Sequence, residues 1–348
     1  MYSIFKNDYV ASIFAHVLRI LGVDSVVISR RVVKKYLQRN KGNSIEILHT
    51  IANNILRKRI KICIERIYGV PIGFYKNITI LYDTKKYMEV EYYIVDIHEK
   101  CSIDITNKTV SLFLSVYPKI PMILIDATLW ELHHEEEKRK AIKQFLVLIN
   151  TIRKRLTDLN VLLVSPPIEL IDLVKGFVEF IETNNNSVYN TIDSSKAIIL
   201  DPYAHDELTV KDIMENQYFI IGLLIDDKFP RPYATYMLKL LQAINFNRKA
   251  IKLYGSIIGV PKEINKVIDI ILDVKLNSMS LEEAIINNMS IDDKVKRIIY
   301  DIEKDLAKGR TIDENHIERY ISIYNVNDIQ FRKIYKRIKN YLKSLGRT

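Results

Sequence analysis

Between residues 118 and 274 the sequence alternates short apolar runs with longer amphipathic stretches, and this alternation constrains the fold more than any other feature. The runs typical of buried strands are 122–126, 160–164, 197–201, 218–225 and 251–254. Helical patterns are found at 130–156, 168–182, 209–215, 233–244 and 262–272. Apolar strands that alternate with helices predict a parallel sheet covered on both faces. We therefore expect an α/β domain at 118–275.

The segment before this domain has a mixed pattern. It begins with a helical run at 4–21 and a β-branched stretch at 25–28. Residues 89–95 and 109–114 show the two-residue alternation of strands. We expect a small α+β domain at 1–117.

The segment after the α/β domain has helical patterns only. Ser280 followed by Glu283 is a capping box, which marks a helix start. We expect a small helical domain at 276–348.

Basic residues exceed acidic residues by 52 to 42, which gives a formal net charge of +10. Residues 30–41 contain six Lys or Arg and no acid, and residues 332–348 contain seven and no acid. A second helical pattern carries Arg57, Lys58, Arg59, Lys61 and Arg66. Such stretches are typical either of an RNA-binding surface or of solvated helix faces.

The cysteines and the apolar runs bear on the cellular compartment. Cys63 and Cys101 are too few for a disulfide framework or a cysteine-based zinc site, and they fit a reducing cytoplasm. No apolar run approaches the ~20 residues of a membrane helix. The first apolar region is interrupted by His16, Arg19 and Asp24, which favours a folded helix over a signal peptide. We expect a cytoplasmic protein with no membrane partner.

Candidate functional residues follow the predicted strands, because ligands of an open parallel sheet bind at the carboxyl ends of its strands. These loops are 126–128, 200–203, 222 with 226–228, and 254–261. The glycines and isoleucines of the last loop suit an adenosine, although glycine in such a loop equally serves a turn. No glycine motif for a dinucleotide or a nucleoside triphosphate occurs.

His133 and His134 precede the acidic run 135–137, which raises the question of a metal site. Adjacent residues on a helix point about 100° apart, so these side chains do not converge. A charged first turn of a helix explains the run better, and we expect no metal.

Several motifs, taken in order, resemble the archaeal tRNA methyltransferases that modify N1 of the purine at tRNA position nine, a branch of the SPOUT superfamily. The resemblance rests on 255–265 with 281–286, on 199–203, on 219–226, and on Asp126 followed by 135–138. It covers about 118–290.

This resemblance implies a SPOUT-type parallel sheet with a carboxyl-terminal trefoil knot, S-adenosylmethionine as cofactor, and tRNA as partner of a monomer without an obligate protein partner. It implies catalytic roles for Asp226 and Asp126. The implied cofactor-binding residues are Leu200, Asp201, Pro202, Gly222, Leu224, Gly255, Ser256, Ile257, Ile258, Gly259 and Asn265. The residues we expect to bind RNA are Arg30, Arg31, Lys34, Lys228, Arg231, Arg332 and Lys336.

The chemistry leaves the target base open. Guanine N1 carries a proton that Asp226 would accept, whereas adenine N1 has a free lone pair, and its methylation creates a cation that the same carboxylate would stabilise. In either case the base must leave its stack.

Two positions depart from the family pattern and support a rival interpretation. Leu223 stands where relatives commonly have a second glycine, and Asp227 follows the expected catalytic aspartate. The rival is a noncatalytic tRNA-binding protein with a degenerate SPOUT domain, and cofactor binding separates the two. A SPOUT methyltransferase of another RNA would require the resemblance to stop at the fold.

Overall fold

The computed structural model describes residues 8–38, 43–175, 182–184, 186–225, 231–242 and 244–345. The chain divides into two compact units. Unit 1 comprises Met1–Ile120, Ile152–Val161 and Lys175–Glu182, and unit 2 comprises Pro121–Thr151, Leu162–Val174 and Thr183–Thr348.

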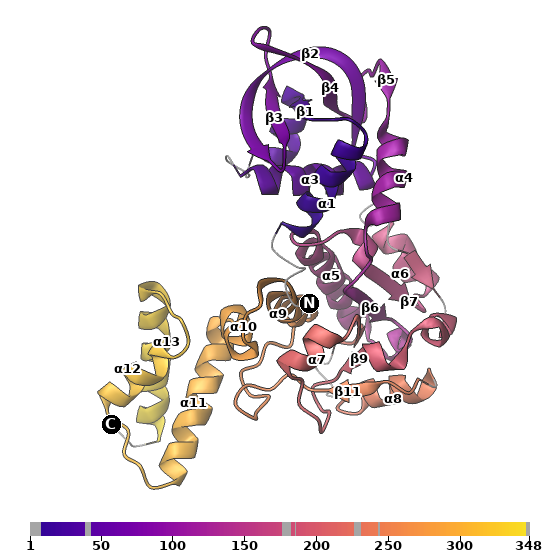
Figure 1. Ribbon diagram of the computed structural model, residues 1–348. Coiled ribbons are helices and arrows are strands. Elements are labelled where there is room, and N and C mark those ends of the chain that lie inside the picture. Colours follow the sequence, from indigo (N-terminus) through magenta and orange to yellow (C-terminus); the bar gives the residue numbers. More distant parts are fainter. Residues whose placement is uncertain are drawn as a thin grey trace. The chain divides into compact units, whose positions relative to one another are not determined.

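Unit 1 contains a small sheet whose pairings close into a ring (Figure 1). Its strands are β1 (Ser25–Ile28), β2 (Ile60–Tyr75), β3 (Ile78–Asp83), β4 (Met88–Asp96) and β5 (Ile103–Asp104). Strand β1 runs parallel to both β3 and β4, and the long β2 runs antiparallel to the same two strands. The bulges in β2 allow one strand to pair with β4 in its first half and with β3 in its second.

The helices of unit 1 are α1 (Tyr9–Ile20), α2 (Arg30–Val32), α3 (Ser44–Leu56) and α4 (Thr106–Val116), with a π-helical turn at Val33–Leu37 after α2. Helix α1 packs against α3 and α4, and α3 packs against β2. Phe14 and Leu18 lie four residues apart on α1 and are fully buried, as a single apolar helix face requires.

Two sequence predictions for unit 1 are wrong. Residues 109–114 belong to helix α4, whose buried Thr109 and Phe113 are spaced by four, and whose first turn is held by the Asp104 carboxylate accepting the Thr106 N–H at 2.8 Å. The basic pattern predicted as helical lies in β2 from residue 60 onward. There Ile60 and Ile62 face the core together, with a period of two.

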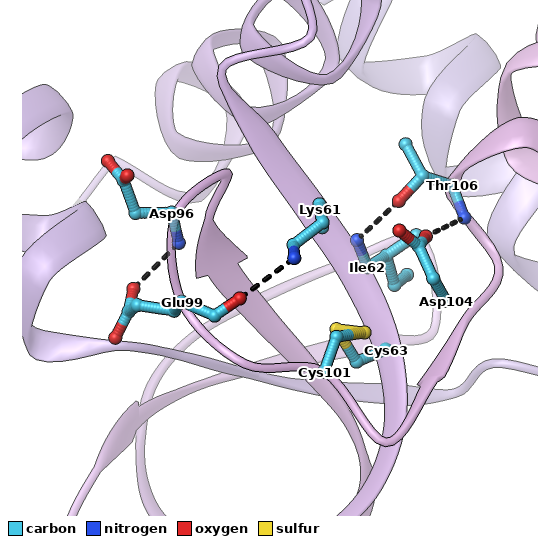
Figure 2. The surroundings of a disulfide bond; sticks show 8 residues. All are labelled: Lys61, Ile62, Cys63, Asp96, Glu99, Cys101, Asp104 and Thr106. Atoms are coloured by element: carbon cyan, nitrogen blue, oxygen red, sulfur yellow. Dashed lines mark hydrogen bonds between the residues drawn. A yellow bond between two sulfur atoms is a disulfide. The ribbon is translucent and has the colours of Figure 1, made fainter.

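The two cysteines form a disulfide, Cys63–Cys101, which corrects the expectation drawn from their number (Figure 2). It joins strand β2 to the segment after β4. Hydrogen bonds hold the same segment. Lys61 Nζ donates to the Glu99 carbonyl at 2.8 Å, and the Glu99 carboxylate accepts the Asp96 N–H at 2.7 Å. The disulfide does not by itself decide the compartment, because intracellular proteins of hyperthermophiles also contain disulfides.

The second sheet has the order β11-β9-β10-β6-β7-β8. Its strands are β6 (Met122–Asp126), β7 (Val161–Val164), β8 (Glu182–Asn184), β9 (Ala197–Leu200), β10 (Tyr218–Gly222) and β11 (Asn247–Lys249). The pairs β6–β10, β9–β10 and β9–β11 are parallel. The predicted α/β class with a parallel sheet is confirmed.

Helices α5 (Glu135–Arg153), α6 (Ile168–Val174), α7 (Val210–Glu215), α8 (Ala234–Leu241) and α9 (Ile264–Asn277) alternate with these strands. The predicted helix at 130–156 is interrupted, because a 3₁₀ turn at Trp130–Leu132 precedes α5 and the His133 ring bonds back to the Trp130 carbonyl. The prediction of a strand at 251–254 is wrong. The last described strand is the polar β11, and in the apolar run that follows it Ile251 and Leu253 are buried before an exposed turn.

The chain after α9 is helical, as predicted, with α10 (Leu281–Asn288), α11 (Ile291–Ala307), α12 (Glu314–Ser322) and α13 (Asp328–Ser344) (Figure 1). Ser280 and Glu283 form the predicted capping box of α10. Helix α10 packs against α9, and α13 packs against α11 and α12. Among the described residues no helix is both long and apolar enough to cross a membrane.

Candidate active site

The carboxyl ends of β6, β9, β10 and β11 meet at one edge of the sheet in unit 2. Gly222, the last residue of β10, is paired in register with Asp126, the last residue of β6. Leu200 ends β9, the neighbour of β10, and is in register with Lys249 of β11. The segments that follow these four strands therefore begin at the same edge, which is where parallel sheets bind ligands.

Asp126 is fully buried at this edge. Its carboxylate accepts hydrogen bonds from the Tyr189 hydroxyl at 2.5 Å and from the Thr128 N–H at 2.8 Å, and its carbonyl accepts the Leu223 N–H at 2.7 Å. Desolvation raises the pKa of Asp126, since burial disfavours the charged form more than these donors favour it. Desolvation, reinforced by the carboxylate, also raises the pKa of Tyr189, so this hydroxyl remains a donor.

Helix α8 closes this edge next to Asp126. Gly222 lies against it, because a Cβ placed on Gly222 would be 3.6 Å from the Leu238 side chain. Gln242, which follows α8, donates its amide to the Thr128 hydroxyl. Its buried Oε1 has no hydrogen-bond partner within the part of the chain that the structure describes. A buried acceptor without a donor is costly, so this atom suits a donor from a ligand.

The Asp201 side chain is already paired. It is buried beneath the loop after β9, receives the Arg248 guanidinium at 2.6 Å, and accepts the Tyr203 N–H at 2.9 Å. Arg248 in turn lies 4.5 Å from the centre of the Tyr236 ring. In this arrangement the carboxylate shapes the loop that contains Leu200 and Pro202.

The glycine-containing loop after β11 begins with a two-residue turn. Leu253 and Ser256 exchange backbone hydrogen bonds, and the two residues between them, Tyr254 and Gly255, have φ of 49° and 76°. Both positive angles define a type I′ turn, in which glycine is favoured and tyrosine is strained. The loop exposes Tyr254 and Ile258, while Gly259, also at positive φ, is buried. Exposed apolar side chains beside a fixed backbone fit the predicted nucleoside site, and Asn265 follows in α9.

Asp226 and Lys228 lie outside the described residues. The residues before and after this stretch are held by the segment that precedes and begins α5. The Ile225 N–H donates to His133 Nε2 at 3.0 Å. Arg231 donates to the Glu137 carboxylate at 2.9 Å, to the Leu132 carbonyl at 2.8 Å and to the Ile225 carbonyl at 3.2 Å. The hydrogen bond from Arg231 is the main cause that lowers the pKa of Glu137 to about 2.

The cluster 133–137, considered for a metal, is therefore part of this clamp. Among the described residues no group of His, Cys, Asp and Glu could hold a metal ion.

The predicted RNA-binding residues of unit 1 are partly paired with acids. Arg30 and Arg31 each lie 3.9 Å from a carboxylate, of Asp83 and Asp96 respectively, and Lys34 is exposed nearby. Asp96, fully buried, also accepts Lys35 at 2.9 Å.

In unit 2 the exposed Arg332 and Lys336 lie four residues apart on α13, on the same side of the helix. Further along the same helix, Lys339 is bound to Glu314.

Comparisons with known proteins identify the family of the chain. No protein-family model matches the chain. A crystal structure of Sulfolobus acidocaldarius Trm10 in complex with S-adenosylhomocysteine has a TM-score of 0.67 and 27% identity, over 94% of this chain and 98% of that one. A tRNA (adenine(9)-N1)-methyltransferase of S. acidocaldarius is 33% identical over 293 residues, which is 84% of this chain and 88% of the relative. The chain belongs to the Trm10 family of tRNA methyltransferases. The family inferred from the ordered motifs is thereby confirmed.

Two further Trm10-family comparisons are consistent. A second crystal structure of S. acidocaldarius Trm10 has a TM-score of 0.55 and 32% identity, over 80% of this chain and 97% of that one. A tRNA (guanine(9)-/adenine(9)-N1)-methyltransferase of Thermococcus kodakarensis is 27% identical over 174 residues, 48% of this chain and 47% of the relative.

Sequence reasoning did not predict the contacts of three residues at this candidate site. Tyr189 lies in a polar segment with no motif, and nothing in the sequence pairs it with Asp126. Gln242 could have been found as a polar residue at the end of a helix next to the sheet edge. A charged first turn explains Glu137 from the sequence alone, because its partner, Arg231, is 94 residues away in the sequence.

Proposed function

We propose that this protein transfers the methyl group of S-adenosylmethionine to N1 of adenine at position nine of tRNA. The observation that carries the proposal is the 33% identity to a tRNA (adenine(9)-N1)-methyltransferase over 84% of the chain. Adenine is chosen over guanine because this relative is more similar, over a longer stretch, than the relative named for both bases.

The residues at the sheet edge fit the cofactor. The loop 255–259 offers glycine backbone and the exposed Ile258 side chain to a nucleoside. The Gly255 position has open space where a side chain would be, since nothing lies within 4 Å of a Cβ placed there. The buried Oε1 of Gln242 is an acceptor for a ligand amino group. Leu200, Pro202, Gly222 and Leu224 are proposed to complete the site, together with Ser256, Ile257, Gly259 and Asn265.

Bound S-adenosylmethionine supplies an electrophilic methyl group on a sulfonium. Adenine N1 uses its lone pair to form the new bond to carbon, the carbon–sulfur bond breaks with its electrons remaining on sulfur, and the adenine ring becomes cationic. Asp226 is proposed to stabilise this cation electrostatically. Asp126, fixed by Tyr189, is proposed as the second carboxylate next to Gly222. A buried carboxylate next to a developing cation is stabilised in its ionised form as the reaction proceeds.

The test is incubation of the purified protein with unmodified tRNA and methyl-labelled S-adenosylmethionine, followed by nuclease digestion and nucleoside mass spectrometry. We expect labelled 1-methyladenosine that maps to position nine. A matched transcript with uridine at that position should take up no label. Labelled 1-methylguanosine from a guanine-9 transcript would show that the choice of adenine is too narrow. Intact tRNA binding without label would favour the noncatalytic alternative.

The role of Asp226 has its own test. Asp226→Asn should lower kcat by far more than it lowers tRNA affinity, because the carboxylate acts on charge that develops during methyl transfer. Equal losses of kcat and tRNA affinity would assign Asp226 a structural role.

The exposed basic residues of α13 are proposed to contact tRNA phosphates. Charge reversal of Arg332 and Lys336 should weaken tRNA binding. It should also reduce the steepness of the plot of log affinity against log salt concentration by about 2. Reversal of the exposed Lys143 on α5 is the matched control. An unchanged slope in the α13 variant would remove this helix from the interface.

We also propose that the sheet of unit 2 contains the family's trefoil knot and that the protein acts as a monomer. Strand β11 returns beside β9, and Ala250 then exchanges hydrogen bonds of 2.8 Å with Asp206 and Leu208 in the loop after β9. This pairing brings the chain's return path against an earlier loop. Light scattering with size-exclusion chromatography tests the monomer, for which a mass near 40.7 kDa is expected.

A further inference from the structure

Helix α11 carries a buried cation, Arg297. Arg297 is 2% exposed and lies on a different side of this helix from the buried apolar residues Val295, Ile298 and Ile302. A buried guanidinium must have partners for its donors, because an unpaired charge in the protein interior is costly. Its partners therefore indicate what it does.

One end of the guanidinium holds the loop after β11. Arg297 Nη1 donates to the Leu253 carbonyl at 2.6 Å and to the Ile258 carbonyl at 3.4 Å. These two carbonyls lie on either side of the strained turn at Tyr254 and Gly255. The guanidinium also lies 5.5 Å from the centre of the Tyr254 ring, within reach of a cation–π contact. One side chain thus fixes both limbs of the loop.

The other end of the guanidinium is fixed by the helical segment itself. Arg297 Nε lies 3.1 Å from the Asp301 carboxylate, one turn further along α11. The same carboxylate oxygen accepts the hydroxyl of Tyr324 at 2.7 Å, and Tyr324 is buried after α12. A continuous chain of hydrogen bonds therefore runs from Tyr324, after α12, through Asp301 and Arg297 to the loop.

The loop also packs directly against α11. A Cβ placed on Gly259 would lie 2.6 Å from the Cβ of Arg297 and 2.9 Å from the Asp293 carbonyl. Glycine is required there because a side chain would collide with the helix. Next to Asn265, Lys266 of α9 lies 3.7 Å from the Asp293 carboxylate. Helix α11 therefore contacts both parts of the proposed cofactor site.

A second buried cation on α11 provides a comparison. Lys294 is one turn before Arg297 and equally buried, but its Nζ donates to the Asn325 carbonyl at 3.1 Å, away from the loop. If both residues only anchored the helical segment, their loss would have the same consequences. Only Arg297 reaches the loop.

We propose that Arg297, held by Asp301 and Tyr324, is a positioning residue that preorganises the loop 253–259 for S-adenosylmethionine. The proposal rests on the proposed function of that loop. It makes the helical segment after α9 a part of the methyltransferase site, in addition to any contact it makes with tRNA.

The expected consequence follows from the population of the binding conformation. Apparent affinity falls in proportion to the fraction of molecules in which the loop is correctly formed. If the fraction falls to a tenth without Arg297, the Kd for S-adenosylmethionine rises about tenfold. Because the reacting groups are unchanged, kcat at saturating cofactor should fall much less, and tRNA affinity should stay within about twofold.

The experiment compares Arg297→Met, Arg297→Lys and Tyr324→Phe with the control Lys294→Met, all in the full chain. Cofactor and tRNA affinities are measured by calorimetry, and hydrogen exchange of the segment 251–261 is measured without cofactor. Arg297→Met should raise the cofactor Kd and speed exchange in the loop. Arg297→Lys should recover part of both, and Tyr324→Phe, which keeps the ring, should give a smaller change of the same kind. Lys294→Met should leave loop exchange at the wild-type rate.

The outcomes separate this proposal from the function on which it rests. If the wild type binds no S-adenosylmethionine, the proposed function fails, while loop exchange still tests the positioning role. Unchanged loop exchange and unchanged cofactor Kd in Arg297→Met would overturn the positioning role, as would equal effects of Arg297→Met and Lys294→Met. If Arg297→Met does not fold, the same comparisons made with Tyr324→Phe decide the matter.

Discussion

The Cys63–Cys101 disulfide is expected to contribute strongly to the stability of unit 1. It closes a loop of 38 residues. A cross-link of that span removes chain entropy from the unfolded state worth about 4 kcal/mol at 25 °C. With a typical urea dependence of about 2 kcal/mol per molar, its loss should lower the unfolding midpoint of unit 1 by about 2 M. The hydrogen bonds of Lys61 and Glu99 hold the same segment after reduction, so local order should largely remain.

The assay can follow the two units separately. Trp130, the only tryptophan, belongs to unit 2, so its emission reports that unit alone, whereas far-ultraviolet circular dichroism reports both. Adding a reductant should lower the urea midpoint of unit 1, which circular dichroism detects. The midpoint of unit 2, which tryptophan emission detects, should not change. A variant with both cysteines changed to alanine should match the reduced wild type and should not respond to reductant. A midpoint shift below about 0.5 M, or an equal shift in the tryptophan transition, would refute the assignment of this stabilisation to unit 1.

Three other perturbations have expected results. Arg231 lowers the pKa of Glu137 from 4.5 to about 2. The ionised carboxylate therefore stabilises the fold fully above its unfolded pKa of 4.5, and this stabilisation is lost as the pH falls from 4.5 to about 2. Urea unfolding of wild type and Glu137→Gln should therefore differ at pH 7 and converge towards pH 2. Gly259→Ala, with φ of 78° and a collision with α11, should cost about 1–3 kcal/mol in thermal unfolding, and more than Gly255→Ala, whose surroundings are open. Lys275→Met removes three hydrogen bonds to carbonyls at the end of α7 and should cost about 3 kcal/mol in urea unfolding, whereas no loss would show that these carbonyls are satisfied otherwise.

The parallel α/β sheet could be predicted because most of its strands are short and continuously apolar and alternate with helices. This pattern is typical of a parallel sheet covered on both faces. The prediction failed where the period was ambiguous. Residues 109–114 alternate like a strand but are helical, since only the spacing of Thr109 and Phe113 reaches the core. The run at 251–254 contains Ile251 and Leu253, which are buried without forming a strand, whereas the true edge strand is polar and pairs on one side only. Burial and strand formation are separate properties, and hydrophobicity reports the first.

The candidate site shows the same division between local and distant information. Glycine at 255 and 259 follows from backbone angles that the loop needs, so a local pattern could reveal it. The requirement at Gly259 is partly nonlocal, because α11 fills the space of its side chain.

Arg297 and Asp301 illustrate what the sequence alone cannot predict about the site. In sequence they are an ordinary pair spaced by four on a helix, which is usually a weak surface interaction. Only the burial of Arg297 distinguishes this pair, and only the fold shows that Arg297 faces the loop after β11. A charged residue that is buried away from the apolar stripe of its helix should therefore be treated as a sign of a specific buried partner. In this protein, following that sign leads from helix α11 to the loop proposed to bind the cofactor.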